Sequence, residues 1–413
     1  MKNKIKVLFV VISYFQSLLL AVDIVKSNGS EIAVRQIIES TRSITYYNGE
    51  ISWANFDYSR FESTIKEMQD MGANTIWFVL PWIDFQAQAL PEPQWNEKAV
   101  ENLNNAITIV QTQGMRVMLP LCYLGKGWSP KGIDPNVWTA DKDMYQAFGL
   151  YAKTLITRLL QNGNDNMSFL LYGEGCYPSF HRTREYQITV KSFRKWCRDN
   201  NDDINFWNSR WGTCYKWDNL LPFTGKTASD KENTQNLLAD YWRWSSSIIC
   251  ERHGSLAHEI RGIIGNKALI GYHDDAIIAK DWGGGVTPIP KDNPYQFLSF
   301  AHYYTLHEYG SLDKFVLQTN DVITKFKKLY PEMPLGIFET GLCEQDFDRN
   351  NQANVISEIA HIAERKDVGI NIWMWQDHIT GDKCQQTFGL ITQNGKKKPA
   401  YLMLHKIWQK GNN

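Results

Sequence analysis

The sequence predicts an α/β fold: a closed (β/α)8 barrel, or TIM barrel, with eight parallel strands. Three observations favour it. An amphipathic helix, a Gly or Pro, and a short apolar run follow one another repeatedly along the chain. Each apolar run is nearly continuous, as expected of parallel strands covered on both faces. No glycine-rich phosphate-binding loop follows the first run, which argues against a doubly wound sheet.

The strands can be placed in order from the helices between them. Phe61, Ile65 and Met68 share one helix face, and Gly72 ends that helix just before the second strand. Similar units recur to the end of the chain, which indicates closure into a barrel. The predicted strands are Ser43–Tyr47, Asn74–Leu80, Met115–Leu121, Ser168–Tyr172, Ala268–Tyr272, Gln296–Tyr303, Leu335–Phe338 and Gly369–Trp375.

The unit after the fourth strand is enlarged and rich in tryptophan. It runs from Tyr172 to Ala268. Its tryptophans are Trp196, Trp207, Trp211, Trp217, Trp242 and Trp244. Loops that follow barrel strands lie on the catalytic face. We therefore expect this insertion either to form a wall or lid of the site, or to pack as a helical excursion that touches no substrate.

The N-terminus has the pattern of a secretory leader. Lys2, Lys4 and Lys6 precede an apolar run from Val7 to Val22. This run is shorter than the roughly 20 apolar residues that a membrane span needs. The pattern predicts a signal peptide over residues 1–21 and a single domain over residues 22–413. It implies a secreted or periplasmic protein without stable membrane association after cleavage; a retained N-terminal anchor is the alternative.

Composition points to a carbohydrate ligand. Lys+Arg and Asp+Glu are 44 each, and without basic blocks the chain has no electrostatic footprint for nucleic acid. The 16 Trp and 19 Tyr suit a protein that stacks sugar rings on aromatic side chains, although most of these residues are expected in the core. The oligomeric state is not indicated.

The cysteines suggest no framework of disulfides and no metal site. They are Cys122, Cys176, Cys197, Cys214, Cys250, Cys343 and Cys384, an odd and scattered set. One or two bridges are possible, and Cys197 with Cys214 is the closest pair in sequence. No CxxC or His/Cys spacing suggests zinc. We predict neither a metal nor a cofactor.

Two strand ends carry a carboxylate beside glycine. The fourth strand runs into Gly173-Glu174-Gly175, and the seventh into Glu339-Thr340-Gly341. A carboxylate at a buried strand end is costly unless it is paired or functional. Glycoside hydrolysis with retention needs two carboxyl groups about 5–5.5 Å apart. The ends of these strands face each other across a barrel mouth, so Glu174 and Glu339 are the predicted catalytic pair.

The chain resembles the clan A glycoside hydrolases, which include cellulase- and mannanase-like family 5 enzymes and β-galactosidases. In that clan the acid/base Glu ends strand four and the nucleophile Glu ends strand seven, positions that Glu174 and Glu339 match. The clan's His-x-Tyr at strand six is similar to His302-Tyr303-Tyr304. The chain departs from the clan at Gly173, where Asn is usual, and at Val79-Leu80-Pro81, where family 5 often has Arg-x-Pro.

The resemblance and the strand ends together suggest substrate contacts. Strand eight of the clan carries a Trp below the reactive sugar, for which Trp375 is preferred over Trp373. The segments Phe388–Ile391 and Lys398–Tyr401 resemble the closing segment of such barrels. A hydroxyl such as that of Tyr304 would keep Glu339 ionised. The predicted substrate-binding residues are His302, Tyr304, Trp375, Trp82, Tyr123, Trp128, Tyr272 and His273.

Three functions remain open at this stage. The first is a retaining glycoside hydrolase that acts on a β-linked glycan by double displacement. The second is a carbohydrate-binding barrel that has lost catalysis, which would explain the missing Asn and Arg. The third is a metal-dependent barrel hydrolase, disfavoured because the first strand ends without His. Its candidate ligands are His273, Asp274, Asp275, His302 and His307.

Overall fold

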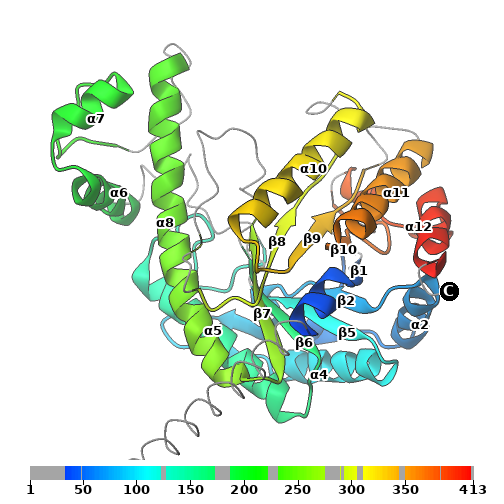
Figure 1. Ribbon diagram of the computed structural model, residues 1–413. Coiled ribbons are helices and arrows are strands. Elements are labelled where there is room, and N and C mark those ends of the chain that lie inside the picture. The colour runs from blue at the N-terminus through cyan, green and yellow to red at the C-terminus, as the bar shows by residue number, and fades with distance from the viewer. Residues whose placement is uncertain are drawn as a thin grey trace, which may run out of the picture.

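A closed barrel of eight parallel strands forms the centre of the protein, with helices around it (Figure 1). The computed structural model describes residues 33–47, 49–121, 127–172, 187–221, 231–274, 289, 293–304, 310–343, 349–381 and 383–410. The predicted TIM barrel is therefore confirmed.

All eight predicted strands are present in the barrel. They are β1 (Arg42–Tyr46), β2 (Thr75–Phe78), β5 (Arg116–Pro120), β6 (Met167–Tyr172), β7 (Ala268–Asp274), β8 (Phe297–Ala301), β9 (Leu335–Thr340) and β10 (Gly369–Ile372). Their order is β1-β10-β9-β8-β7-β6-β5-β2, closed by pairing of β1 with β2. A two-stranded hairpin, β3 (Gln86–Gln88) with β4 (Gln94–Trp95), lies outside the barrel.

Amphipathic helices surround the strands. The main ones are α2 (Phe61–Met71), α4 (Glu97–Thr112), α5 (Lys142–Gln161), α8 (Lys231–Ile264), α10 (Leu312–Leu329), α11 (Arg349–Lys366) and α12 (Pro399–Lys410). As predicted, α2 buries Phe61, Ile65 and Met68 and ends at Gly72. Gly72 has φ 110°, and a Cβ there would lie 2.7 Å from that of Trp408 on α12, so only glycine fits.

One ring contact shows which side chains face the barrel interior. The rings of Trp77 on β2 and His273 on β7 are 5.9 Å apart, although β5 and β6 separate these strands in the sheet. A contact between non-neighbouring strands has to cross the interior. Paired residues of parallel strands point to the same side. Ser299, which pairs with His273, therefore also faces the interior.

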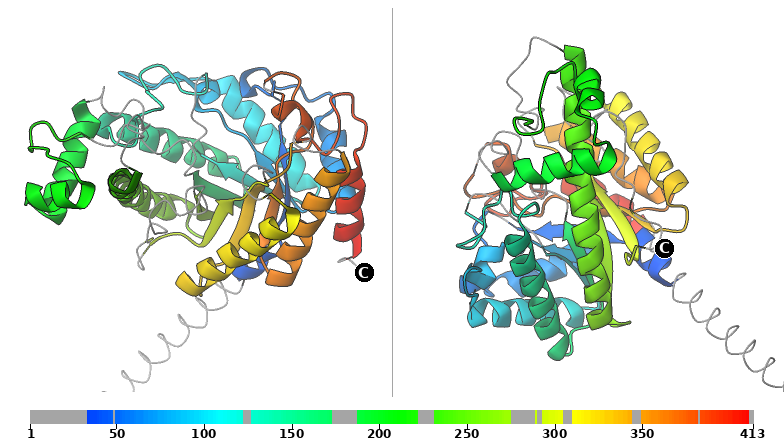
Figure 2. Two further views of the ribbon diagram at one scale, coloured as in Figure 1. Left: turned by 90° about the horizontal axis from the view of Figure 1, so that it is seen from above. Right: turned by 90° about the vertical axis from the view of Figure 1, so that its left-hand side faces the viewer.

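The insertion after β6 has a core of its own. The helices α6 (Gln187–Asn200) and α7 (Ile204–Trp211) pack on α8 and project away from the barrel (Figure 2). With 34 residues, α8 is about 50 Å long, far longer than a barrel strand. Trp207, Trp211 and Trp244 are buried in this second cluster. These indoles therefore stabilise a helical excursion and do not line the barrel mouth.

A buried charge cluster ties α7 to α8. Asp240 on α8 is 1% exposed and accepts hydrogen bonds from Arg210, Arg243 and the indole nitrogen of Trp211. A buried carboxylate is tolerated when it is paired in this way. The cluster thus explains how the insertion accommodates a charge beside its aromatic core.

The segment after β10, called the closing segment here, is held in place by a disulfide and a buried ion pair. A disulfide joins Cys343, after β9, to Cys384. Lys398 and Asp377 form a buried ion pair at 2.8 Å. Cys197 and Cys214 both carry free thiols, so the pair closest in sequence does not form a bridge. Cys122 and Cys176 lie outside the described residues.

No helix among the described residues is both long and apolar enough to cross a membrane. The signal peptide predicted over residues 1–21 lies outside the described part of the chain. The leader and the domain boundary at residue 22 therefore stay predictions.

Candidate functional site

Glu339 faces the barrel interior at the carboxyl end of β9. Two consecutive residues of β8 pair with Ile337 and Glu339, so β9 carries one extra residue, a β-bulge, at Phe338. The ring of Phe338 meets Phe297 at 6.0 Å inside the barrel. Without the bulge, the next residue would point outward. The bulge instead turns Glu339 inward as well, where only 6% of it is exposed.

Tyr303 holds one oxygen of this carboxylate. It lies just after β8, and its hydroxyl donates a hydrogen bond to Glu339 Oε1 at 2.8 Å. The ring of Tyr303 packs edge-on against Phe388 of the closing segment. Tyr304, the hydroxyl predicted for this role, instead packs against Phe315 of α10 on the outer side of the barrel, so that prediction is wrong. Adjacent residues of an extended segment point to opposite sides.

His273 lies beside the other oxygen. Its Nε2 is 3.7 Å from Glu339 Oε2, and its Nδ1 is 2.9 Å from the hydroxyl of Ser299. The imidazole is completely buried, and burial lowers its pKa to about 3. Although 3.7 Å is within ion-pair range, His273 is therefore a neutral imidazole beside the carboxylate at neutral pH.

Two other predicted contacts, besides Tyr304, face away from this cluster, at the outer side of the barrel. His302 stacks on Phe315 at 4.7 Å, and its Nε2 lies 2.9 Å from the Thr319 hydroxyl, so it is a core histidine under α10. Tyr272 packs against Tyr295 and His253. Together with Tyr304, these residues are not brought to Glu339.

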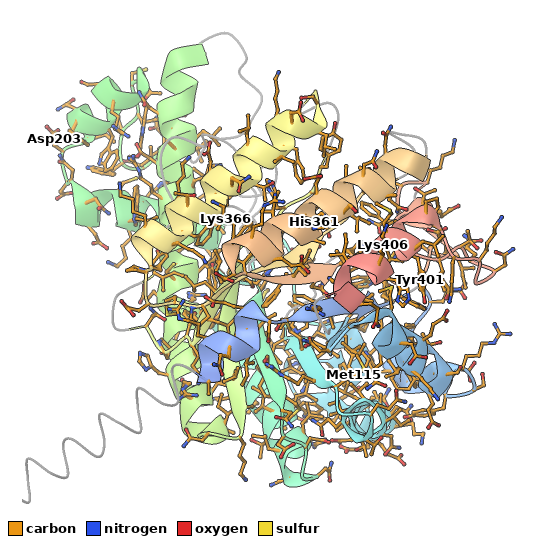
Figure 3. The ribbon with its side chains drawn as sticks, turned by 45° about the vertical axis from the view of Figure 1, so that its right-hand side comes forward. Met115, Asp203, His361, Lys366, Tyr401 and Lys406 are labelled. Atoms are coloured by element: carbon orange, nitrogen blue, oxygen red, sulfur yellow. A yellow bond between two sulfur atoms is a disulfide. The ribbon has the colours of Figure 1, made fainter. Side chains whose placement is uncertain are left out.

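Two predicted tryptophans are also core residues. Trp82, on α3 (Trp82–Phe85), is fully buried, stacks on Tyr151 and donates its indole N–H to Gln86. Trp375 is 2% exposed and packs against Tyr401, which Figure 3 shows on α12 at the outside of the barrel. Neither indole is free to stack on a sugar in this arrangement.

An aromatic rim lies instead around Tyr47, just after β1. Its ring is 6.0 Å from Trp128, 6.0 Å from Trp373 and 5.0 Å from His378. Trp373 donates its indole N–H to the side chain of Gln385, at 3.2 Å, next to the disulfide at Cys384. Trp128 was among the predicted contacts. Trp373 was not among the predicted contacts; Trp373 and Trp375 are both an even number of residues from Asn371, so strand alternation did not separate them.

Several predicted residues lie outside the described part of the chain. They are Glu174, Tyr123, Asp275 and His307. Barrel strand β6 ends at Tyr172, two residues before Glu174. Of the predicted metal ligands, His273 and His302 face opposite sides of the sheet, and no three His, Cys, Asp or Glu of the described residues form a group that could hold a metal.

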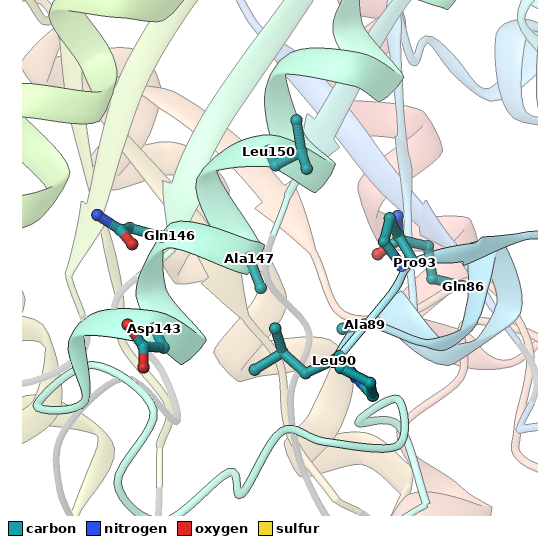
Figure 4. A pocket seen from close by; sticks show the side chains of 9 residues that line it. Gln86, Ala89, Leu90, Pro93, Asp143, Gln146, Ala147 and Leu150 are labelled. Atoms are coloured by element: carbon teal, nitrogen blue, oxygen red, sulfur yellow. The ribbon is translucent and has the colours of Figure 1, made fainter.

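A hollow of about 690 Å³ lies outside the barrel, between the β3–β4 hairpin and α5 (Figure 4). It is lined by Gln86, Ala89, Leu90, Pro91, Pro93, Asp143, Gln146, Ala147 and Leu150. None of these residues belongs to a barrel strand, and only Asp143 carries a charge. It contains no residue from the end of a barrel strand, so we place the candidate site at Glu339.

The fold and the site define the class of protein: a (β/α)8 barrel with a hydrogen-bonded carboxylate facing the interior at the end of its seventh barrel strand. The fold of the clan A glycoside hydrolases, which the sequence resembles, is thereby confirmed. No protein-family model matches the sequence, and no curated protein matches it.

Solved structures of glycoside hydrolases share this fold. A β-galactosidase from the Antarctic haloarchaeon Halorubrum lacusprofundi is 16% identical, with a TM-score of 0.63 over 90% of this chain and 58% of that one. An exo-β-1,4-mannosidase from Opitutaceae bacterium strain TAV5 is 15% identical, with a TM-score of 0.57 over 90% and 59%. A GH5_18 protein from Streptomyces cattleya in complex with GlcNAc is 14% identical, with a TM-score of 0.57 over 91% and 81%. The chain thus spans less than two thirds of the length of the first two, and at these identities the likeness is one of fold.

Proposed function

We propose that this protein is a glycoside hydrolase that cleaves a β-linked glycan with retention, with Glu339 as nucleophile and Glu174 as acid/base. The observation that carries the proposal is the buried Glu339 carboxylate, turned into the barrel by a bulge and hydrogen-bonded by Tyr303. β-bulges that re-aim a side chain are over-represented next to active sites. The mouth of the barrel is where (β/α)8 enzymes carry their chemistry.

The reaction would proceed in two displacements. In the first, a Glu339 oxygen bonds to the anomeric carbon while the glycosidic C–O bond breaks, and the leaving oxygen takes the proton of Glu174. In the second, a water gives a proton to Glu174 and its oxygen replaces Glu339 at the anomeric carbon. The Tyr303 hydroxyl favours the ionised form of Glu339 at the start of this cycle and again at its end.

The proposed substrate is a β-linked oligosaccharide. Within the aromatic rim, Trp128 is partly exposed and suits the apolar face of a sugar ring, and it packs against Tyr47, which is 7% exposed and contacts Trp373, itself 8% exposed. The structural neighbours support this class, since they are described as a β-galactosidase, an exo-β-1,4-mannosidase and GH5_18 proteins in complex with GlcNAc or Manβ1-4GlcNAc.

We further propose that the protein works outside the cytoplasm, in the secreted or periplasmic compartment. The basic and apolar N-terminus has the form of a signal peptide. The Cys343–Cys384 disulfide supports the same location, because such bonds persist in oxidising compartments. Detection of the mature protein outside the cytoplasm, with an N-terminus near residue 22, would test this.

Hydrolysis of aryl β-glycosides and β-linked oligosaccharides tests the function. Glu339→Gln and Glu174→Gln should each lower kcat by about a thousandfold or more. Azide should restore turnover to Glu339→Gly with an inverted product, and to an acid/base variant on activated substrates. The exposed Glu332→Gln is the matched control and should retain full activity.

Two outcomes would contradict the proposal. Near-normal turnover by Glu339→Gln or Glu174→Gln would remove the assigned residue from the chemistry. Binding of glycans by the wild type without turnover on any substrate would instead favour the carbohydrate-binding barrel.

A further inference from the structure

Three side chains from three neighbouring strands, Ser299, His273 and Glu339, contact one another in turn, and Glu339 is the candidate nucleophile. Ser299 on β8 lies 2.9 Å from His273 Nδ1, and His273 Nε2 on β7 lies 3.7 Å from Glu339 Oε2 on β9. All three are buried at the interior of the barrel, at 1%, 0% and 6% exposure. The contact between His273 and Ser299 follows from the strand pairing, because these two residues are partners in the register of β7 and β8.

We infer that His273, anchored by Ser299, is a positioning residue that orients the Glu339 carboxylate and favours its ionised form. The inference rests on the proposed function, in which Glu339 is the nucleophile. In this role His273 acts on the substrate only through Glu339, whereas the sequence predicted that it contacts the substrate directly.

The inference requires the imidazole tautomer in which the Ser299 hydroxyl donates to Nδ1. The Ser299 hydroxyl has one proton and lies closer to His273 Nδ1, at 2.9 Å, than to the Tyr272 carbonyl, at 3.4 Å. When the hydroxyl donates to Nδ1, the ring proton of the neutral imidazole sits on Nε2. That N–H then faces Glu339 Oε2 and presents the positive end of a dipole to the carboxylate.

Each oxygen of the Glu339 carboxylate therefore has a different neighbouring side chain. Tyr303 donates to Oε1 at 2.8 Å, while His273 faces Oε2 at a longer 3.7 Å. Contacts at both oxygens limit rotation of the carboxylate plane, and an attack geometry depends on such orientation. The edge-on contact of His273 with Trp77 across the barrel limits movement of the imidazole in turn.

The mutational test separates positioning from stability. His273→Phe keeps an aromatic ring beside Trp77 but removes both nitrogens, and Ser299→Ala removes the anchor. We expect His273→Phe to lower kcat about 10- to 100-fold and Ser299→Ala by less, with KM within about twofold of wild type. The acid limb of the pH profile of kcat/KM should move to higher pH, and His273→Gln, which keeps an N–H donor, should recover part of the loss.

The matched control is His302→Phe, a buried histidine at the end of the neighbouring strand that faces α10. It should lower thermal stability without moving the pH profile of the folded enzyme. If His273→Phe behaved as His302→Phe does, while Glu339→Gln abolished turnover, the inference would fail and the proposed function would stand.

A second measurement does not depend on turnover. The 13C NMR titration of the Glu339 carboxyl, assigned with Glu339→Gln, should show a midpoint at higher pH in His273→Phe than in wild type. An unchanged midpoint would overturn the inference whether or not the wild type hydrolyses a glycan. A wild type without turnover would overturn the proposed function alone.

Discussion

Tyr303 and Glu339 meet inside the barrel because β8 and β9 are neighbours and the bulge in β9 turns the Glu339 side chain inward. The hydroxyl of Tyr303 reaches Glu339 Oε1 at 2.8 Å, whereas the residues on either side of it, His302 and Tyr304, both face α10. The adjacent Tyr304 shows the consequence, since its ring packs on Phe315 of α10.

Tyr303→Phe should therefore slow the proposed hydrolysis, because it removes a hydrogen-bond donor to the carboxylate. We expect kcat to fall roughly 10- to 100-fold, with the acid limb of the pH profile moved to higher pH. Tyr304→Phe is the matched control and should leave both quantities unchanged. Steady-state kinetics on an aryl β-glycoside across pH measure the difference, and equal effects of the two variants would contradict the assignment.

The buried His273 should make folding sensitive to pH. Burial lowers its pKa to about 3, whereas the unfolded chain takes up a proton at about pH 6.5. Between these values the unfolded state binds more protons, so stability falls as pH drops from 6.5 toward 3. His273 alone should remove about 2 kcal/mol of the free energy of unfolding between pH 7 and pH 5.

Urea unfolding at pH 7 and pH 5 measures this difference in stability. His273→Gln should reduce the pH dependence, and substitution of the half-exposed His361 on α11 is the control for replacing a histidine. The expectation is wrong if the wild type and His273→Gln lose equal stability between the two pH values.

Trp373 and Trp375 should respond differently to replacement by alanine. Trp373 is 8% exposed and supports Tyr47 in the aromatic rim, so Trp373→Ala should raise KM about tenfold by displacing the rim. Trp375 packs against Tyr401, so Trp375→Ala should cost about 3–5 kcal/mol of stability and leave KM unchanged in the folded fraction. Kinetics at low temperature together with thermal unfolding distinguish the two, and a reversed pattern would restore Trp375 as the platform.

The Cys343–Cys384 disulfide should contribute substantially to stability. The two cysteines are 41 residues apart, and closing a loop of that length restricts the unfolded chain by about 4 kcal/mol in the chain-entropy model. The double variant Cys343→Ala/Cys384→Ala should unfold at a correspondingly lower urea concentration. Cys214→Ser, at an exposed free thiol, is the control, and equal stability of all three proteins would argue against the bond.

The strand order and the position of the carboxylate were predictable from the sequence. Apolar runs, helix faces and stops such as Gly72 are local features, and they placed all eight strands and put Glu339 at a strand end. The position of Glu174 was predicted in the same way, and it lies outside the described residues.

The partners of Glu339 were less predictable, because they depend on which face each residue takes. His302 and Tyr304 fit the resemblance to the clan but face α10, whereas His273 and Tyr303 face the carboxylate. Strict alternation would place the adjacent residues Phe338 and Glu339 on opposite faces of β9. The bulge lets both side chains point into the barrel.

The sequence by itself determined the class of fold, the number of barrel strands and the strand end at which the site lies, because hydrophobic periodicity is a property of short sequence segments. The tertiary structure decided which of two adjacent side chains enters the barrel. A shift of one residue moves a strand's side chains to the opposite face. Only pairing with neighbouring strands, and one bulge in β9, selected Tyr303 over Tyr304 and turned Glu339 inward.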